Sequence, residues 1–346
     1  MEPLSDTPPA RSSPVARADR GESLSEDFVS LTSPYRRELL AHCYRILGSA
    51  RDAEDLVQET YVNAWRAFDR FEGRSSVRTW LYRIATRACL KALERGDRRS
   101  LPSGLGAASH DPEGPLTARI PEPSWLEPLP DALFMDRPAD PAEIIEARQS
   151  TRLALVAALQ LLPPRQRAVL ILRDVLQWRA NEVAELLGTT RPAVNSALQR
   201  ARAVLERAAP AEDDLDLVEP GDPALRRLLD RYVAAFENTD VDGLTKVLTE
   251  DARFEMPPIP AWFEGREAIG RLLAARFRIH GGFRLVPASA NAQPAFALYL
   301  DEDGATRAHA LQVLTVTGTG ISHIVQFTGT GAFAGLGLPE VLPPGR

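Results

Sequence analysis

Cysteine is nearly absent from this chain of 346 residues, which contains only Cys43 and Cys89. The two lie too far apart to form a closely spaced metal or redox motif, so we expect no metal site, no cofactor and no disulfide scaffold, and both side chains in a core. No stretch approaches the roughly 20 apolar residues that span a bilayer. The first two dozen residues also lack the apolar segment of a secretion signal. These absences predict a cytoplasmic protein that does not contact a membrane.

Negative charge is unevenly distributed along the chain. The formal net charge of −6 would by itself argue against binding to nucleic acid. Residues 35–99, however, contain 14 Lys or Arg against 9 Asp or Glu, whereas residues 100–149 contain 3 against 9 and residues 209–346 contain 12 against 19. A basic module in acidic surroundings can bind a polyanion locally, so the overall charge does not exclude DNA binding.

The length predicts two or three domains of about 150 residues each. Two stretches have helical periodicity, and Pro- and Gly-rich acidic segments separate them from each other and from a region of mixed α and β character. The predicted organisation is a disordered tail (1–26), a helical module (27–96), a flexible linker (97–140), a second helical module (141–209), an acidic connection (210–222), an α+β domain (223–338) and a short tail (339–346).

The second helical module contains the spacing of a helix-turn-helix. Ala184 is followed four residues later by Gly188 and six residues after that by Val194. A small residue lets two helices cross closely, glycine permits the tight turn, and a buried valine seats the second helix on the first. Thr190 can cap that second helix.

The outward face of this second helix has the side chains that hold phosphates and read base edges in the major groove. It carries Arg191, Pro192, Asn195, Ser196, Gln199, Arg200 and Arg202. A solvated polar face on a helical bundle is the alternative explanation. The turn pattern favours DNA binding, because solvation does not require the glycine or the small residue.

The first helical module presents two unusual faces. Asp52, Asp55 and Glu59 are spaced three and four residues apart and form an acidic strip, which spacing alone does not distinguish from ordinary helix surface. The helix after Gly73 places basic residues and Trp80 together, a combination suited to single-stranded DNA because cations follow phosphates and rings stack on bases. Ser49 resembles the cap of the first of these helices.

Two segments of this module resemble domain 2 of the extracytoplasmic-function branch of sigma-70 factors. They read DAEDLVQETYVNAW over 52–65 and FEGRSSVRTWLYRIA over 71–85. In the second module, LPPRQR over 162–167 and QRAR over 199–202 resemble domain 4 of the same family. The resemblance implies two all-α sigma domains, a helical bundle and a helix-turn-helix, that bind RNA polymerase core enzyme and promoter DNA without enzymatic chemistry.

The resemblance also implies a role for each matching residue. The polymerase-docking residues would be Asp52, Asp55, Leu56, Gln58 and Glu59. The residues that open and hold the −10 element would be Gly73, Arg74, Ser75, Ser76, Arg78, Trp80, Arg83, Arg87 and Lys91. The outward face of the helix-turn-helix would bind the −35 element, and the linker would thread through the polymerase.

The α+β domain resembles the SnoaL-like branch of the cone-shaped nuclear-transport-factor-like fold, as found in a sigma subgroup of actinobacteria. The resemblance rests on YVAAF over 232–236, FEMPP over 254–258, NAQPA over 291–295 and AHALQ over 308–312. The pattern predicts helices over 223–238 and 265–280, and strands over 283–290, 296–300, 306–317 and 320–327 in a curved antiparallel sheet.

Cones of this type enclose a pocket, and the resemblance implies that a small-molecule ligand could bind there. The candidate pocket residues are Trp262, Asn291, Gln293, His309 and His323. No carboxylate partner for either histidine is evident, so a structural role is favoured over catalysis. We expect the domain to pack against the linker or the first module and to regulate the sigma factor in place of a separate anti-sigma protein.

Two other classes of protein could also contain a helix-turn-helix and a pocket domain. One is a ligand-sensing one-component regulator, and the other is a SnoaL-like enzyme tethered to DNA. Neither accounts for the acidic strip and the basic, aromatic helix of the first module. A regulator would bind DNA without melting it, so promoter opening by core polymerase discriminates between them.

Overall fold

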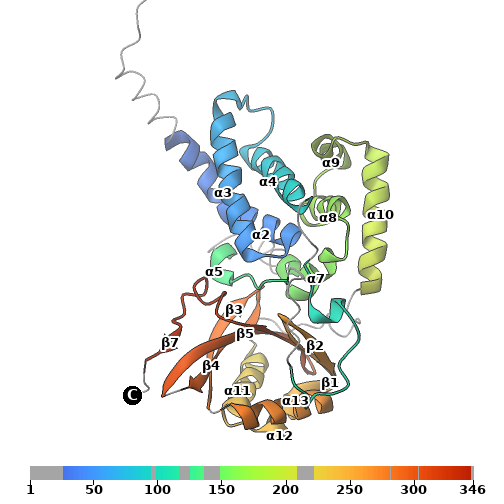
Figure 1. Ribbon diagram of the computed structural model, residues 1–346. Coiled ribbons are helices and arrows are strands. Elements are labelled where there is room, and N and C mark those ends of the chain that lie inside the picture. Colours follow the sequence, from blue (N-terminus) through green and yellow to red (C-terminus); the bar gives the residue numbers. More distant parts are fainter. Residues whose placement is uncertain are drawn as a thin grey trace, which may run out of the picture.

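The structure, a computed structural model, stacks a helical layer on one face of a curved sheet and three further helices on the other face (Figure 1). It describes residues 26–94, 99–116, 125–135, 149–208, 222–280, 282–302 and 304–343. The predicted disordered tail, apart from residue 26, and the acidic connection, apart from residue 222, lie outside this part of the chain. No helix within the described ranges is long and apolar enough to cross a membrane.

The first helical module is built from α2 (Arg36–Leu47), α3 (Ala50–Ala67) and α4 (Val77–Leu93). Ser49 caps α3 as predicted, with its hydroxyl accepting a hydrogen bond from Asp52 N at 3.0 Å. Cys43 and Cys89 are buried free thiols in the core between α2 and α4, as expected.

Gly48, which ends α2, is required for two reasons. Its φ is +71°, in the left-handed region that side chains disfavour. A Cβ atom there would also lie 2.8 Å from Leu126 in the linker and 3.0 Å from Gln160 in the second module. The bare backbone therefore lets three parts of the chain meet at one point.

The second helical module consists of α7 (Leu153–Gln160), α8 (Pro164–Leu170), a π-helical turn (Ile171–Val175), α9 (Ala180–Leu187) and α10 (Arg191–Ala208). The helix-turn-helix spacing is confirmed. Ala184 and Val194 are buried where α9 and α10 meet, and Gly188 adopts a φ of +61° in the turn. Thr190 Oγ1 accepts from Ala193 N at 3.4 Å.

The C-terminal domain contains α11 (Pro223–Glu237), α12 (Val241–Val247) and α13 (Arg266–Ile279), and its two long predicted helices are confirmed. Its strands are β1 (Leu248–Met256), β2 (Ile259–Glu264), β3 (Phe283–Ala290), β4 (Gln293–Glu302), β5 (Ala305–Thr317), β6 (Gly320–Thr328) and β7 (Val341–Leu342). They form one sheet in the order β2-β1-β6-β5-β4-β3, with β7 beside β5.

The four strands predicted from the sequence, β3 to β6, are antiparallel neighbours, so that prediction is confirmed. It did not cover the pairing of β1. β1 and β6 run parallel, whereas the other pairs are antiparallel. A parallel pair needs a long connection, and here it includes α13 and the four strands β2 to β5.

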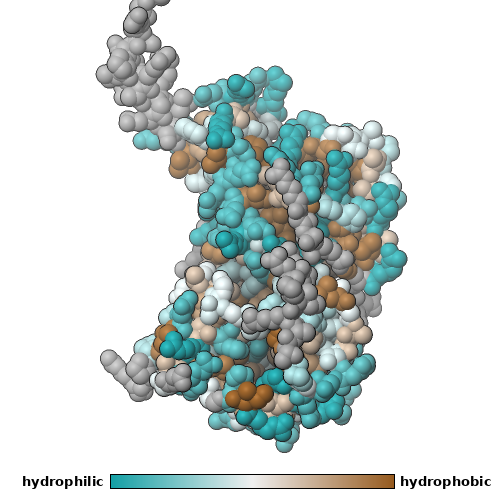
Figure 2. Space-filling model, in the orientation of Figure 1, coloured by the Kyte–Doolittle hydropathy of each residue, from teal (hydrophilic) through white to brown (hydrophobic). Residues whose placement is uncertain are grey.

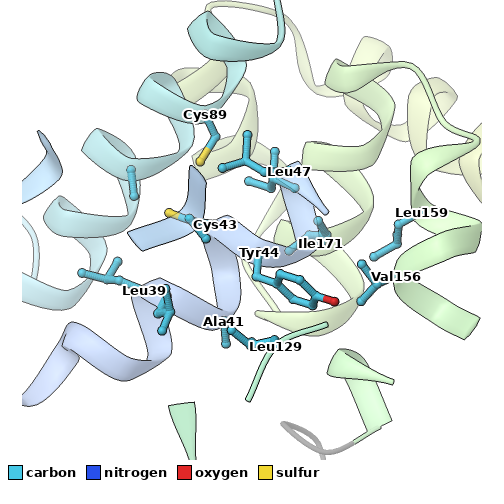
Figure 3. Close-up of a cluster of buried hydrophobic side chains, with 14 of the residues drawn as sticks. Leu39, Ala41, Cys43, Tyr44, Leu47, Cys89, Leu129, Val156, Leu159 and Ile171 are labelled. Atoms are coloured by element: carbon cyan, nitrogen blue, oxygen red, sulfur yellow. The ribbon is translucent and has the colours of Figure 1, made fainter. Parts of the chain in front are cut away.

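The two faces of the sheet belong to different cores, because successive residues of a strand point to opposite sides. Ala310, Leu314 and Ile324 pack on the inner face with the aromatic residues of α11 and α13. Leu311 and Val325 point outward and belong to a buried cluster that also includes both helical modules. Figure 3 shows part of that cluster, where Tyr44 of α2, Leu129 of the linker, and Val156 and Leu159 of α7 come together. The three folded parts therefore share one core.

Candidate nucleic-acid and polymerase interface

The acidic strip lies on the exposed side of α3. Asp55, Gln58 and Glu59 are exposed and Leu56 is partly buried. The visible surface over α3 is largely hydrophilic (Figure 2). Asp52 differs from its neighbours, because Arg99 at the start of the linker binds its carboxylate at 2.5 Å. One end of the strip is thus already occupied by the linker.

Helical spacing places Trp65 on one apolar stripe with Val57, Tyr61, Ala64 and Phe68 and so predicts a core position for it, and this prediction is wrong. The side chain is 44% exposed, although its ring packs edge-on against Phe28 with centroids 5.2 Å apart. Val62, one turn earlier, is 48% exposed. Because both lie on α3 beyond Gln58 and Glu59, they extend the acidic strip with an apolar segment.

The loop before α4 and the helix itself hold the residues predicted to contact the −10 element. Ser76 caps the helix, since its hydroxyl accepts from Thr79 N at 3.1 Å. Trp80 is partly buried and packs against Phe71, with ring centroids 4.8 Å apart. Gly73, Arg74, Ser76, Arg78, Arg87 and Lys91 are exposed, and Ser75 and Arg83 are half-buried.

Two arginines of α4 already have carboxylate partners within the protein. Arg78 donates to Glu38 at 2.9 and 3.1 Å. Arg83 forms a two-point ion pair with Glu185 of α9, at 2.9 and 3.2 Å, and only 25% of its side chain is exposed. The second contact joins the two helical modules. Sequence reasoning missed it, because the partners are 102 residues apart.

The outward face of α10 is open by comparison. Arg191, Pro192, Asn195, Gln199, Arg200 and Arg202 are exposed, and Ser196 is half-buried. Within this face, Arg200 donates to Ser196 Oγ at 2.6 Å, and Arg202 pairs with Asp174 at 2.7 Å. Val194, Leu198 and Ala201 on the opposite side are buried. The helix therefore presents a basic and amide-bearing ridge to solvent.

The five candidate pocket residues do not gather around one cavity of the described structure, so this prediction needs correction. Asn291, Gln293 and Trp262 contact the linker or the second helical module from the outer side of the sheet. His309 lies at a bulge of β5 near His280, with ring centroids 5.9 Å apart, and burial lowers its pKa. The interior of the cone is instead occupied by the aromatic core.

Asn291 joins three parts of the protein with one buried side chain. Its Oδ1 accepts from Leu129 N at 3.0 Å, and its Nδ2 donates to Tyr44 Oη and to Thr151 O, both at 2.8 Å. Asn291 and Ala292 form the two-residue turn between β3 and β4, with φ of +57° and +55°. Asparagine adopts a positive φ more readily than most residues, so Asn291 is a sequence feature that indicates a turn at this position.

Gln293, two residues after Asn291, also links the sheet to the second helical module. Its Oε1 accepts from Leu153 N at 2.8 Å, at the beginning of α7, and its Nε2 donates to Leu314 O and Thr315 Oγ1 at 3.1 and 2.9 Å. The hairpin turn thus holds the first module, the linker and the second module together through Asn291 and Gln293.

His323 does have a carboxylate partner, contrary to expectation. Its Nε2 lies 2.8 Å from Oε1 of Glu255, a residue of β1 that is only 1% exposed. The same carboxylate accepts from Ser103 N at 2.8 Å and Ser103 Oγ at 3.0 Å. Burial opposes ionisation of Glu255, but the hydrogen bonds and charge of His323 and the donors of Ser103 outweigh it, so its pKa lies below the usual value.

Comparison with known families accounts for each folded part. Residues 31–99 match Sigma-70 region 2, residues 152–205 match Sigma-70 region 4, and residues 229–331 match the SnoaL-like domain. Two such regions in this order define a sigma-70-type protein. The ECF RNA polymerase sigma factor SigG of Mycobacterium tuberculosis (strain H37Rv) is 52% identical over 318 residues, 91% of this chain and 85% of that protein. The chain therefore belongs to the ECF RNA polymerase sigma factors.

A second relative supports the architecture as a whole. SigJ of Mycobacterium tuberculosis is 30% identical over 227 residues, which cover 65% of this chain and 64% of that protein. Its crystal structure matches with a TM-score of 0.60 at 23% identity, over 90% of this chain and 100% of that chain. The fold of helical sigma domains followed by a SnoaL-like sheet domain is thus shared.

Proposed function

We propose that this sigma factor reads promoters at two points, through α10 at the −35 element and through α4 with its preceding loop at the −10 element, and that its own C-terminal domain holds the two readers in a closed arrangement. The observation that carries this proposal is the shared core: both helical modules pack on the outer face of the sheet. Since its partners are polymerase and promoter DNA, we expect it to act in the cytoplasm.

The closed arrangement is incompatible with contact to both promoter elements at once. The elements are named for positions about 25 base pairs apart, which is roughly 85 Å along B-form DNA. Here Arg83 of α4 and Glu185 of α9, the helix directly before α10, are 2.9 Å apart. The modules must therefore separate, and the linker of 44 residues (97–140) can span roughly 145 Å when extended.

The proposed surface for core polymerase is the exposed acidic strip of α3, extended by Val62 and Trp65. Exposed apolar side chains beside charged ones are typical of protein interaction sites. Arg99 has to release Asp52 before polymerase can use the whole strip, because both would contact the same carboxylate. Polymerase docking and linker position are thereby linked.

For the SnoaL-like domain we favour a regulatory role over an enzymatic one. Glu255 lies between His323 and Ser103, so the histidine does not contact the hydroxyl as a general base for a nucleophile would. Inside the cone, the described rings of Tyr232, Phe236, Phe277, Phe283 and Phe296 pack with centroids 5.1–5.9 Å apart. This packing favours a binding partner outside the cone over a small-molecule ligand within it.

The separation of the modules can be measured with spin labels in the full chain. Asp69 and Glu206 are exposed residues of the first and second modules, and Cys43 and Cys89 are fully buried, so Asp69→Cys with Glu206→Cys directs labelling. Pulsed electron spin resonance should show a distance that increases by tens of ångströms, on the order of the promoter spacing, when core polymerase and promoter DNA are added.

A matched pair within the first module provides the control. Asp69→Cys with Glu94→Cys, again at exposed positions, should keep its distance in the complex. If the Asp69–Glu206 distance in the promoter complex equals that of the free protein, the closed-to-open transition does not occur and the proposal is wrong.

A further inference from the structure

Residues 99–116 of the linker, which we call the strap, lie across the sheet edge formed by β1 and β2 and connect the acidic strip of α3 to the C-terminal domain. At one end, Arg99 binds Asp52. Beyond that, Trp262 Nε1 donates to Gly106 O at 2.9 Å and Ser109 N donates to Trp262 O at 2.7 Å. At the other end, Arg276 of α13 donates to Gly114 O at 3.1 Å.

The contact with Glu255 is the most deeply buried charged interaction of the strap. The carboxylate receives the backbone N–H and the hydroxyl of Ser103 on its two oxygens, and His323 completes its hydrogen bonding. Hydrogen bonds to a charged acceptor are stronger than those between neutral groups. The neighbouring charged groups on this face, Arg253 and Glu264, pair with each other at 3.2 Å.

Removing only one of the three donors to Glu255, which are Ser103 N, Ser103 Oγ and His323 Nε2, costs free energy. A carboxylate that loses a donor while it stays buried cannot bind water in its place, so it still bears the cost of desolvation. A carboxylate that becomes exposed to water does not bear this cost. Release of Ser103 therefore favours movement of the strap away from the sheet, so that water can reach Glu255. An arrangement in which Ser103 has left Glu255 while the strap still covers the carboxylate is therefore disfavoured.

We propose that Glu255 and His323 form a latch for the strap, and that withdrawal of Ser103 from this latch frees the linker and Asp52 for polymerase. The latch rests on the proposed function, because it names the contact that holds the closed arrangement. Its occupant is the chain's own linker, seated on the outer face of the SnoaL-like sheet. The signal that opens the sigma factor then acts at this outer site and not inside the cone.

Hydrogen exchange of the full chain, read by mass spectrometry, tests the latch directly, since the amides of Ser103 and Ser109 are themselves donors in the strap contacts. Glu255→Gln removes the charge and keeps the shape. We expect exchange across the strap to accelerate by about tenfold or more. Glu264→Gln is the matched control, because this exposed carboxylate lies on the adjacent strand and pairs only with Arg253 among the described contacts; it should stay within about twofold of the parent.

Ser103→Ala provides a second variant that leaves the C-terminal domain untouched. It removes one of the two donors, so strap exchange should rise by a smaller factor than in Glu255→Gln. If Glu255→Gln also accelerates exchange in β5, the domain has loosened, and Ser103→Ala then decides the matter. Strap exchange like that of Glu264→Gln in both latch variants overturns the proposal.

Promoter opening provides the functional readout. If the latch limits opening, Glu255→Gln should lower the sigma concentration needed for half-maximal open-complex formation severalfold, up to about the factor seen in exchange. An unchanged concentration overturns the role of the latch in polymerase access. The spin-label distances report the closed-to-open transition separately, so failure of the latch and failure of the proposed function give different results.

Discussion

The two helices assigned to DNA differ in how available they are. The outward ridge of α10 is exposed, and its ion pair between Arg202 and Asp174 lies within its own module. In α4, by contrast, Arg83 is held by Glu185 across the module boundary and Trp80 packs on Phe71. If α10 reads the −35 element and α4 the −10 element, as we propose, the first is available in the closed state and the second is partly masked. We then expect binding of a promoter and opening of it to be separate steps.

The largest effect on promoter recognition should come from substitutions on the exposed face of α10. Arg191→Ala combined with Gln199→Ala deletes two side chains that are suited to base edges, each worth about 1–3 kcal/mol of discrimination. We expect preference for the promoter over random DNA to fall about 100-fold. Binding of core polymerase, measured in a pull-down, should stay intact.

Arg207→Ala is the control for this double variant, because Arg207 lies on the same helix and donates to Ala203 O within it. Its promoter preference should resemble that of the parent. Loss of polymerase assembly in the double variant would contradict the division of labour between the two helical modules.

Asn291→Ala should have a large effect on stability, because Asn291 links the two helical modules and the linker through its side-chain hydrogen bonds. The substitution removes three side-chain hydrogen bonds and places Ala at a φ of +57°. We expect the free energy of unfolding in urea to fall by about 3 kcal/mol. Asn238→Ala removes a single exposed bond to Ala234 O and should cost less than about 1 kcal/mol.

The smallest expected effect is that of breaking the ion pair between Arg83 and Glu185. Glu185→Gln removes the charge that holds Arg83. Because Glu185 is 67% exposed, the pair lies at the surface, where ion pairs contribute about 0.2–1 kcal/mol. Affinity for a single-stranded −10 oligonucleotide should rise about twofold to fivefold at low salt. Glu182→Gln, one turn earlier on α9, is the comparison variant. Equal affinities for all three proteins would show that Arg83 is not masked by Glu185.

Local chemistry in the sequence predicted much of the fold. The helix-turn-helix followed from Ala184, Gly188 and Val194, and the beginning of α3 followed from Ser49, because each of these signals acts within a few residues. The direction of β1 relative to β6 did not follow, since strands of either direction show the same alternation of side chains.

The site was predicted only in part. The exposed residues of α3 and α10 were found because helical spacing reveals a face. The partners of Arg83, His323 and Asn291 come from residues 68 to 247 positions away in the chain, and no local pattern reports such contacts. Trp65 was placed inside because its spacing fits an apolar stripe, yet an interaction surface can have the same spacing.

The buried cluster that runs from Leu39 through Leu129 to Val325 also constrains how such a protein can evolve. A C-terminal domain attached to another sigma factor as an independent cassette would present an apolar sheet face without its matching helices. A change in one partner has to be matched in the other two, so we expect the three parts to be inherited as a set. Recombination between relatives should preserve the combination even where promoter-reading residues diverge.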